Sequence, residues 1–303
     1  MKFQDWRAHL ALFFVNTLYG ASHVLAKGVM PNFLTPSVFI LFRVLGATIL
    51  FWVVKWMLPT QKIERKDYLL LAFCGLFGVA INQLCFFYGL NLSSAINSGI
   101  IMTTNPVLVI ILAYFLIKEK ITLSKIAGIL IAAAGAILLT LAGSSGKGDS
   151  LLGDLFLFVN ALSYAIYLVI AKPLMKKYNP LTVITYVFTF GLGFVLLFPP
   201  TLIEFFQTDF QQISNETWAK ITYVIIGVTF LTYLLTMYGL KYLSPAVSSA
   251  YIYFQPVLVI FFAFFLSYIG FAEDYTDTIT WQKGVYMLLI FLGVWLTTRK
   301  QKA

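Results

Sequence analysis

The chain is poor in charge, cysteine and histidine, and each shortage excludes a class of function. Only 11% of its residues are charged, whereas ordinary soluble domains carry about 25%. The two cysteines, Cys74 and Cys85, lie in one apolar segment, roughly 16 Å apart along a helix, so they cannot form a disulfide with each other. The two histidines, His9 and His23, both fall in the first apolar segment, which argues against a zinc site with several ligands. We expect no metal site and no cofactor.

Acidic residues are also missing from the apolar segments. All 12 of them lie in loops or at segment ends, although proton-coupled carriers commonly use an intramembrane Asp or Glu as a relay. The chain must therefore use another group such as His23, transport passively, or exchange solutes. Catalytic motifs are absent as well. The segment Gly143–Asp149 resembles a phosphate loop, but Lys147 is followed by Gly148 and not by Ser or Thr, so we interpret it as a linker and expect no enzyme.

What the chain does have is long apolar runs. Hydrophobic residues make up 60% of it, the mean hydropathy is +0.87, and runs of about 20 apolar residues are typical of membrane-spanning helices. The sequence predicts an all-α integral membrane protein with ten transmembrane helices and no soluble domain. We expect these helices at Leu10–Lys27, Ser37–Leu58, Tyr68–Leu90, Ala95–Ile117, Ile121–Ala142, Leu151–Leu174, Leu181–Ile203, Trp218–Leu240, Pro245–Ile269 and Trp281–Thr298.

The distribution of charge orients these helices. When the N-terminus is placed in the cytoplasm, most lysines and arginines fall on the inner side and most acids on the outer side, which is the positive-inside pattern. This predicts a multi-pass protein of the cell inner (plasma) membrane with both termini cytoplasmic. The pI of 9.4 follows from this topology, since lysines near the anionic leaflet contact the lipid bilayer, and we expect no nucleic-acid partner.

A segment of the first half of the chain recurs in the second half. Tyr88–Leu116 aligns without a gap to Tyr238–Leu266, and both copies contain a Tyr-Gly-Leu corner and a Pro-Val-Leu-Val-Ile run. This indicates a tandem duplication, with copies at residues 1–142 and 151–303 joined by a linker at 143–150. Because five spans is an odd number, the two five-helix repeats are inverted relative to each other. Inverted repeats are typical of secondary transporters, whose substrate site lies near the membrane midplane.

Polar residues inside apolar spans are costly in lipid, so they tend to face an interior or a cavity. Asn16, Tyr19 and His23 share one face of the first span, and Asn160, Tyr164 and Tyr167 share a face of the sixth. They either line a central cavity or act as inter-helix contacts and interface anchors. The candidate substrate-binding residues are Asn16, Tyr19, His23, Arg43, Asn82, Gln83, Asn105, Asn160, Tyr164, Tyr167, Tyr251 and Gln255.

Arg43 is the only formal charge well inside a span, where a guanidinium costs about 2.5–3.5 kcal/mol on insertion scales. It either binds an anionic substrate group such as a carboxylate or holds backbone carbonyls at a helix end. Pro106 and Pro256 lie within expected helices, directly after Asn105 and Gln255. Because proline removes a helical hydrogen bond, we interpret both as kinks that either serve gating and substrate contact or only packing.

The ordered set of motifs resembles EamA-type carriers of the drug/metabolite transporter superfamily. The set comprises the Tyr-Gly-Leu corner before a proline in both copies, the Pro36 to Arg43 spacing, and Glu119 followed by Ile121-Thr122. The resemblance implies a ten-helix transporter of amino acids or other small metabolites, often an exporter, with a central cavity built mainly from the first four helices of each copy. It would work by alternating access. The second copy departs from this pattern after Phe265.

Other functions are compatible with parts of the sequence. A sugar, nucleotide-sugar or phosphometabolite carrier would use Lys27 and Arg43 to meet phosphates, and a membrane scaffold would transport nothing. A lipid-modifying enzyme would need clustered His, Asp or Glu, which the spans do not provide. The expected partner is a small-molecule substrate, and the sequence is compatible with either a monomer or a homodimer.

Overall fold

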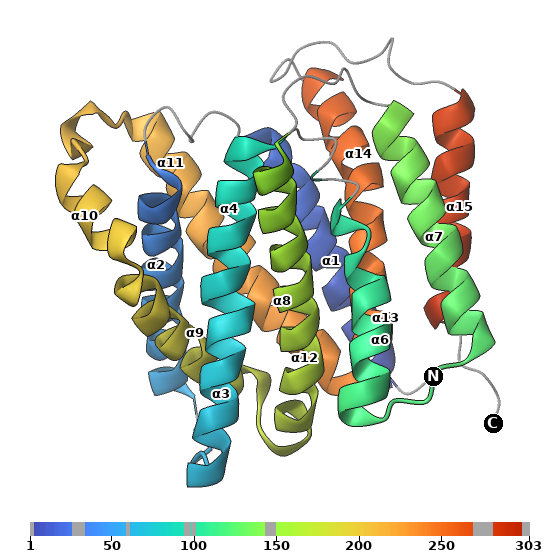
Figure 1. Cartoon of the computed structure of the whole chain (residues 1–303), viewed down its shortest axis with the longest axis horizontal. Helices are drawn as coiled ribbons and strands as arrows, with labels where there is room; N and C mark the ends of the chain where they lie inside the picture. The colour runs from blue at the N-terminus through green and yellow to red at the C-terminus, as the bar shows by residue number, and fades with distance from the viewer. Residues whose placement is uncertain are drawn as a thin grey trace.

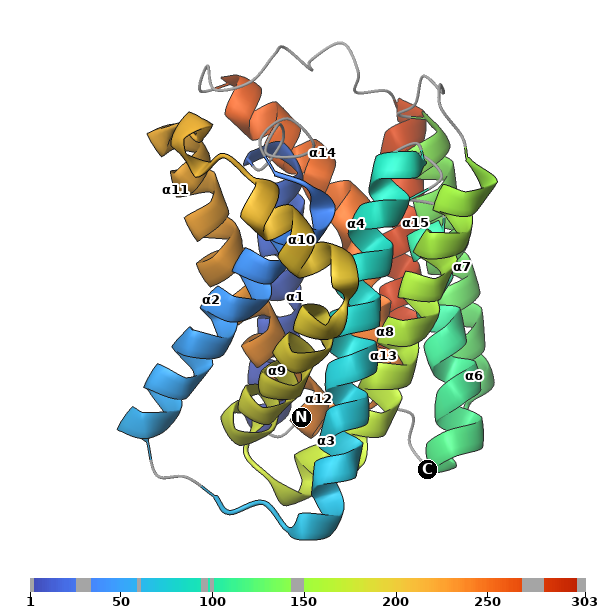
Figure 2. The same cartoon turned by 60° about the vertical axis from the view of Figure 1, so that its left-hand side comes forward.

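The computed structural model describes residues 3–25, 34–58, 61–93, 98, 101–142, 150–268 and 281–298. Within these ranges every secondary-structure element is a helix, and the helices pack side by side as a bundle (Figures 1 and 2). Five helical stretches are long and apolar enough to cross a membrane, namely Pro36–Met57, Arg65–Leu92, Leu151–Lys177, Pro180–Leu197 and Asn215–Tyr242. The described residues are therefore all-α, as predicted, and these stretches are consistent with a membrane protein, while the ten spans and their repeats stay predictions.

The first half of the chain contains eight described elements. They are α1 (Phe3–Leu25), α2 (Pro36–Met57), the short 3-10 helix η1 (Arg65–Asp67), α3 (Tyr68–Gly75), the π-helical stretch η2 (Leu76–Ile81), α4 (Asn82–Leu92), α6 (Asn105–Ile117) and α7 (Leu123–Ala142). Proline at the first position of α2 fits a helix start, because its missing N–H is unpaired there in any case.

The second half begins with the longest helix, α8, whose N-cap Ser150 accepts a hydrogen bond from the Gly153 amide. Its elements are α8 (Leu151–Lys177), α9 (Pro180–Leu197), α10 (Pro199–Gln207), η3 (Phe210–Gln212), α11 (Asn215–Tyr223), the π-helical stretch η4 (Val224–Leu231), α12 (Thr232–Tyr242), α13 (Pro245–Ala250), the 3-10 turn η5 (Tyr251–Phe254), α14 (Gln255–Tyr268) and α15 (Trp281–Thr298).

The α-helix is interrupted directly before each of the two prolines. Pro106 is the second residue of α6, after a turn at residues 103–104, and Pro256 is the second residue of α14, which the 3-10 turn η5 joins to α13 without a gap. These irregular turns are compatible with the predicted kinks, whose role in gating stays a prediction. Proline lacks the N–H that a helix interior needs, and that loss has no cost in a helix's first turn.

The apolar pattern of the sequence does not predict the π-helical stretches. Each lies in the middle of a membrane-spanning stretch, η2 between α3 and α4 and η4 between α11 and α12. Both are followed by a helix of 11 residues. Short π-helical turns inside helices are rare and are frequent at functional sites, so their position in both halves draws attention to the residues beside them.

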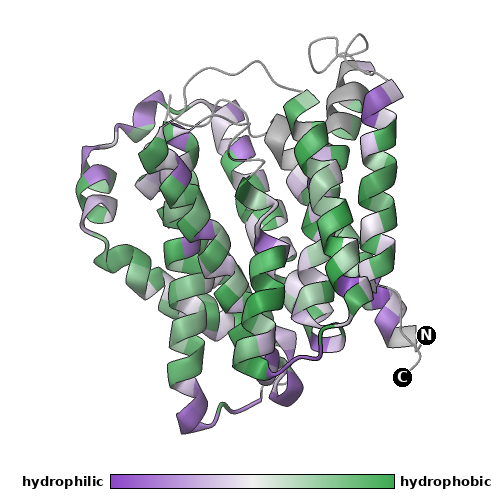
Figure 3. Ribbon diagram, turned by 45° about the vertical axis from the view of Figure 1, so that its right-hand side comes forward, coloured by the Kyte–Doolittle hydropathy of each residue, from purple (hydrophilic) through white to green (hydrophobic). Residues whose placement is uncertain are grey.

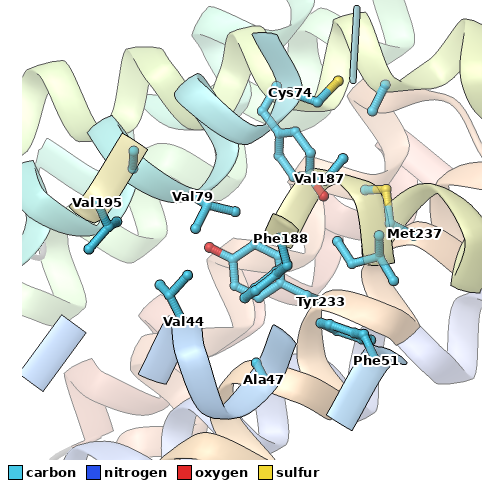
Figure 4. Packing of buried hydrophobic residues seen from close by; sticks show 14 of the residues in the cluster. Val44, Ala47, Phe51, Cys74, Val79, Val187, Phe188, Val195, Tyr233 and Met237 are labelled. Carbon is cyan, nitrogen blue, oxygen red and sulfur yellow. The ribbon is translucent and has the colours of Figure 1, made fainter. Parts of the chain in front are cut away.

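Helices from the two halves of the chain pack against each other crosswise. The structure places α4 against α8, α12 against α1, and α2 against α9 (Figures 1 and 2). The largest buried cluster lies among these helices, and Figure 4 shows Val44, Phe51, Phe188 and Tyr233 within it. Apolar residues predominate in the middle of the bundle, and hydrophilic residues are more frequent toward its two ends (Figure 3), as expected of a protein surrounded by lipid.

Helices α7 and α15 form a separate close pair at one side of the bundle (Figure 1). A Cβ atom built on Gly293 would lie only 2.4 Å from the Ala132 backbone nitrogen, and one on Gly128 would lie 2.6 Å from the Gly293 carbonyl oxygen. Glycine is therefore required at both positions. Small residues at such crossings let transmembrane helices approach until their backbones touch.

Candidate functional site

The centre of the candidate site is Arg43 in α2. Its side chain is buried, and its Nε donates a hydrogen bond to the Thr229 hydroxyl oxygen at 3.1 Å. The guanidinium carbon lies 4.8 Å from the centre of the Phe87 ring and 5.7 Å from that of Phe39. In the described part of the chain no carboxylate pairs with Arg43. A cationic group among aromatic rings and a hydroxyl is suited to an anionic ligand.

The π-helical stretch η4 holds Thr229 in place. The Thr229 hydroxyl donates a hydrogen bond to the carbonyl of Val224, five residues earlier, at 2.9 Å. Since a hydroxyl has a single hydrogen, that bond leaves only the oxygen lone pairs for Arg43. The irregular helix thus presents an acceptor, and not a donor, to the guanidinium.

Tyr233 joins the start of α12 to the π-helical stretch η2. It is the second residue of α12, which follows η4, and its hydroxyl lies 2.9 Å from the Gly78 carbonyl in η2 and 3.3 Å from Asn82 Oδ1. Gln83 Nε2 lies 3.5 Å from the same hydroxyl. The neighbouring Thr232 hydroxyl lies 3.3 Å from that of Tyr19 on α1. Tyr19, Asn82 and Gln83, all predicted site residues, therefore meet around the first two residues of α12.

The predicted asparagines make contacts between helices. Asn160 Nδ2 on α8 donates to the Asn82 carbonyl on α4 at 2.7 Å, and Asn82 Nδ2 donates to the Asn160 carbonyl at 3.5 Å. Asn105 Nδ2 donates to the Ala161 carbonyl at 2.7 Å. Backbone carbonyls thus accept from all three amide nitrogens, which favours the inter-helix role for these residues over direct contact with a ligand.

Two tyrosines of α8 extend the group of side chains around Tyr233. The Tyr164 and Tyr167 ring centres are 5.9 Å apart, and Tyr167 lies 6.4 Å from Tyr233. The Tyr167 side chain is fully buried, yet its hydroxyl has no hydrogen-bond partner among the described residues. An unpaired buried hydroxyl is uncommon and calls for an explanation.

The remaining predicted residues lie in the contact of α1 with η5 and α14. Gln255 Nε2 donates to Asn16 Oδ1 at 3.0 Å, and Asn16 Nδ2 donates to the Leu12 carbonyl. His9 Nδ1 lies 2.6 Å from the Tyr251 hydroxyl. Asn16, Tyr251 and Gln255 are thus brought together with each other around one face of α1. The side chain of His23 and the whole of Lys27 lie outside the described residues.

Sequence reasoning missed Thr229, Thr232 and Tyr233 as site residues. Thr232 and Tyr233 occupy the same repeat positions as Asn82 and Gln83, so transferring the candidates from one half to the other would have found them. Thr229 has no such signal, because its role depends on the π-helical geometry of η4.

Polar contacts also join the two halves of the chain at the ends of the bundle. At one end Asp67 accepts hydrogen bonds from Lys177 Nζ at 2.9 Å and from the Tyr178 hydroxyl at 2.7 Å. In the loop before η1, a hydrogen bond from the Lys66 ammonium lowers the pKa of Glu64. At the other end the Ser37 hydroxyl donates to Glu204, and Ser93 donates to Asp154. These contacts join the two halves of the chain at both ends of the bundle, with Arg43 and its neighbours between them.

Comparison with known proteins identifies the family of this chain. The model of the EamA-like transporter family matches residues 6–141 and again residues 151–299. A transporter of Archaeoglobus fulgidus is 26% identical over 97% of this chain and 98% of its own length. The Bacillus subtilis transporter YetK is 28% identical over 82% of this chain and 76% of its own length. A solved crystal structure superposes with a TM-score of 0.71 at 16% identity, covering 97% of this chain and 96% of that one, which shows the shared fold.

One further relative has a more specific name. A protein of Streptantibioticus cattleyicolor named "Probable terminal-alkyne amino-acid exporter" is 24% identical over 68% of each chain. Since the family model covers nearly the whole sequence in two segments, the chain belongs to the EamA-like transporter family. It is a multi-pass membrane protein and a transporter.

Proposed function

We propose that this transporter moves amino acids or other small carboxylate metabolites across the cytoplasmic membrane by alternating access, with net flux outward or down the gradient. The observation that carries the proposal is the buried Arg43 guanidinium without an anionic partner among the described residues. It lies between helices of both halves of the chain, as expected of a transporter's substrate site.

The electrostatics of Arg43 support an anionic substrate group. A guanidinium has five N–H donors, and described protein atoms accept only the one on Nε. The terminal nitrogens are then available to a carboxylate, which binds guanidinium in a bidentate geometry. Burying this charge in a span costs about 2.5–3.5 kcal/mol, and a role in substrate binding would account for retaining it.

The architecture we infer is ten spans in two inverted five-helix copies, at residues 1–142 and 151–303. The double match to the family model supports it. So does the crosswise packing, in which α4 contacts α8 and α12 contacts α1. The π-helical stretches precede Asn82 and Thr232, which correspond in the alignment of the two copies. Rocking of two such copies around a central site is the usual mechanism of inverted-repeat transporters.

Different observations support the proposed substrate class and the proposed orientation of the chain in the membrane. The name of the Streptantibioticus cattleyicolor relative favours amino-acid export. The distribution of lysine and arginine favours cytoplasmic termini, and the start of α1 and the end of α15 lie on the same side of the bundle (Figure 1). Carboxylates occur only in loops or at the ends of the predicted spans, which favours facilitated diffusion or exchange. A carrier of sugar phosphates or nucleotide sugars is the second candidate, because Arg43 would equally receive a phosphate.

The test is solute release from proteoliposomes containing the purified protein. A mixed pool of amino acids, organic acids and sugar phosphates is loaded, and release is followed by mass spectrometry with and without a proton gradient. We expect saturable release of a few related carboxylates at equal rates in both conditions. Release of phosphorylated sugars alone would favour the second candidate, and release of nothing above empty liposomes would favour a membrane scaffold.

The role of Arg43 is tested in the same assay. Arg43→Gln should abolish carboxylate release while the protein still elutes as a single folded species. Arg65→Gln is the matched control, since Arg65 is exposed in η1, and it should release solutes like the wild type. Unchanged release by Arg43→Gln would reject the carboxylate role.

A further inference from the structure

We infer that Gln83 determines specificity, because its side-chain oxygen is placed to accept a hydrogen bond from an amine that the substrate carries beside its carboxylate. This inference rests on the proposed function and narrows its substrate class. Gln83 lies in α4 with 3% of its surface exposed, and its Oε1 is fully buried without a hydrogen-bond partner among the described residues.

The orientation of the Gln83 amide follows from its neighbours. The Tyr233 hydroxyl has one hydrogen, and it lies beside two acceptors, the Gly78 carbonyl at 2.9 Å and Asn82 Oδ1 at 3.3 Å. With that hydrogen committed, Tyr233 can only accept from Gln83. The Nε2 group must therefore face Tyr233, at 3.5 Å. Oε1 is left as a free acceptor on the opposite side of the amide.

This acceptor lies near the guanidinium. Phe87 is four residues after Gln83 and thus shares its face of α4, and Arg43 lies over the Phe87 ring at 4.8 Å. Gln83 and Phe87 are about one helical turn apart on α4, so the carbonyl acceptor and the cation over Phe87 lie toward the same side of this helix. They fit a molecule that carries a carboxylate and an amine on neighbouring carbons.

An amide oxygen suits this position better than a carboxylate would. A carboxylate one turn from Arg43 would pair with the guanidinium and occupy the site itself. A neutral carbonyl accepts from an ammonium group and leaves the positive charge of Arg43 for the substrate carboxylate. A ligand N–H would also satisfy an oxygen that is otherwise buried and unpaired, which is an unfavourable state for a protein acceptor.

The experiment compares two substrate series in one vesicle. Proteoliposomes are loaded with equal concentrations of 2-amino acids and of the matching carboxylic acids that have hydrogen in place of the amine. We expect the wild type to release the amino acids roughly tenfold faster or more. Gln83→Leu should lose this preference while it still releases the unsubstituted acids. Gln212→Leu, at an exposed position in η3, is the matched control and should keep the preference.

A second variant and the wild type itself keep the inference testable if Gln83→Leu does not fold. Gln83→Glu has nearly the same shape and should pair with Arg43, so it should lose release of both series. Wild-type release of both series at equal rates would overturn the role of Gln83 alone, as would an unchanged preference in folded Gln83→Leu. Release of no carboxylate by the wild type would overturn the proposed function as well.

Discussion

Arg43 Nε and Thr229 Oγ1 are joined by a hydrogen bond of 3.1 Å that links α2, in the first half of the chain, to the π-helical stretch η4 in the second half. The Thr229 hydroxyl donates its own hydrogen to Val224 at 2.9 Å. The orientation of a buried cation therefore depends on an irregular helix in the other half of the molecule. Movement of the two halves relative to each other would change the direction in which the guanidinium points.

Replacing Thr229 should weaken the recognition of carboxylates. Thr229→Val removes the acceptor for Arg43 Nε without a large change in shape, and a hydrogen bond to a charged group is worth about 1.5–3 kcal/mol. We expect the half-saturating concentration of a transported carboxylate to rise by roughly tenfold or more, as measured by initial release from proteoliposomes.

Thr229→Ser is the control for this change, because serine keeps both the hydroxyl donor and the acceptor. Its half-saturating concentration should stay within a few-fold of the wild-type value. If Thr229→Val transported with wild-type affinity, Arg43 would not depend on this bond for its orientation.

Two glycines of α15 should respond differently to the same substitution. A methyl group on Gly293 would lie 2.4 Å from the Ala132 nitrogen, whereas nothing lies within 4 Å of one on Gly284. Gly293→Ala should therefore force α7 and α15 apart and destabilise the protein by about 1–3 kcal/mol. Gly284→Ala should be neutral or stabilise it by about 0.5–1 kcal/mol, since alanine restricts the unfolded chain. Thermal unfolding in detergent measures both, and equal Tm values would contradict the close helix contact.

Much of the fold was predictable because a lipid environment allows few solutions. A spanning segment must satisfy its own backbone hydrogen bonds, so long apolar runs predict helices directly. Because burying polar groups in a span is costly, Arg43, Gln83 and Tyr167 were predicted as site residues. The structure places them on helices that lie close to Tyr233 and Thr229. Here composition and elementary energetics were sufficient.

The local geometry was not predictable in the same way. Nothing in the residues of η2 or η4 distinguishes a π-helical from an α-helical stretch, because the choice depends on tertiary contacts such as that of Tyr233 with the Gly78 carbonyl. The helix starts at Asn105 and Gln255 were missed for a related reason. A proline inside an apolar run is compatible with a kink or with a new helix, and packing decides between them.

The asparagine pair between α4 and α8 predicts unequal effects of two similar substitutions. Asn160 Nδ2 donates to the Asn82 backbone carbonyl at 2.7 Å, whereas the Asn82 side chain makes only a long 3.5 Å contact in return. Asn160→Ala should destabilise the protein by about 0.6–1.7 kcal/mol, the range of such bonds in membrane proteins. Asn82→Ala should cost less, because the main bond goes to its backbone. A larger loss of Tm for Asn82→Ala would show that its side-chain contacts with Tyr233 matter more.

The last prediction concerns two buried tyrosines that differ in one hydrogen bond. The Tyr253 hydroxyl donates to the Thr103 carbonyl at 3.0 Å, whereas the Tyr167 hydroxyl has no partner among the described residues. Both side chains are almost fully buried. Tyr253→Phe removes this hydrogen bond and should destabilise the protein by about 0.5–1.5 kcal/mol, whereas Tyr167→Phe removes a hydroxyl that forms no hydrogen bond with the described residues and should be neutral or stabilising.

For the Tyr167 hydroxyl, the expected effect on transport is opposite to the expected effect on stability. If the Tyr167 hydroxyl is left unpaired because a substrate hydrogen-bonds to it, Tyr167→Phe should lower the rate of carboxylate release severalfold while Tm is maintained or raised. Such a gain in stability with a loss of activity is characteristic of binding sites, where groups needed by a ligand are unsatisfied without it. Wild-type release by Tyr167→Phe would restrict the substrate to the Arg43 side of the cluster, since the phenol would then have no part in binding.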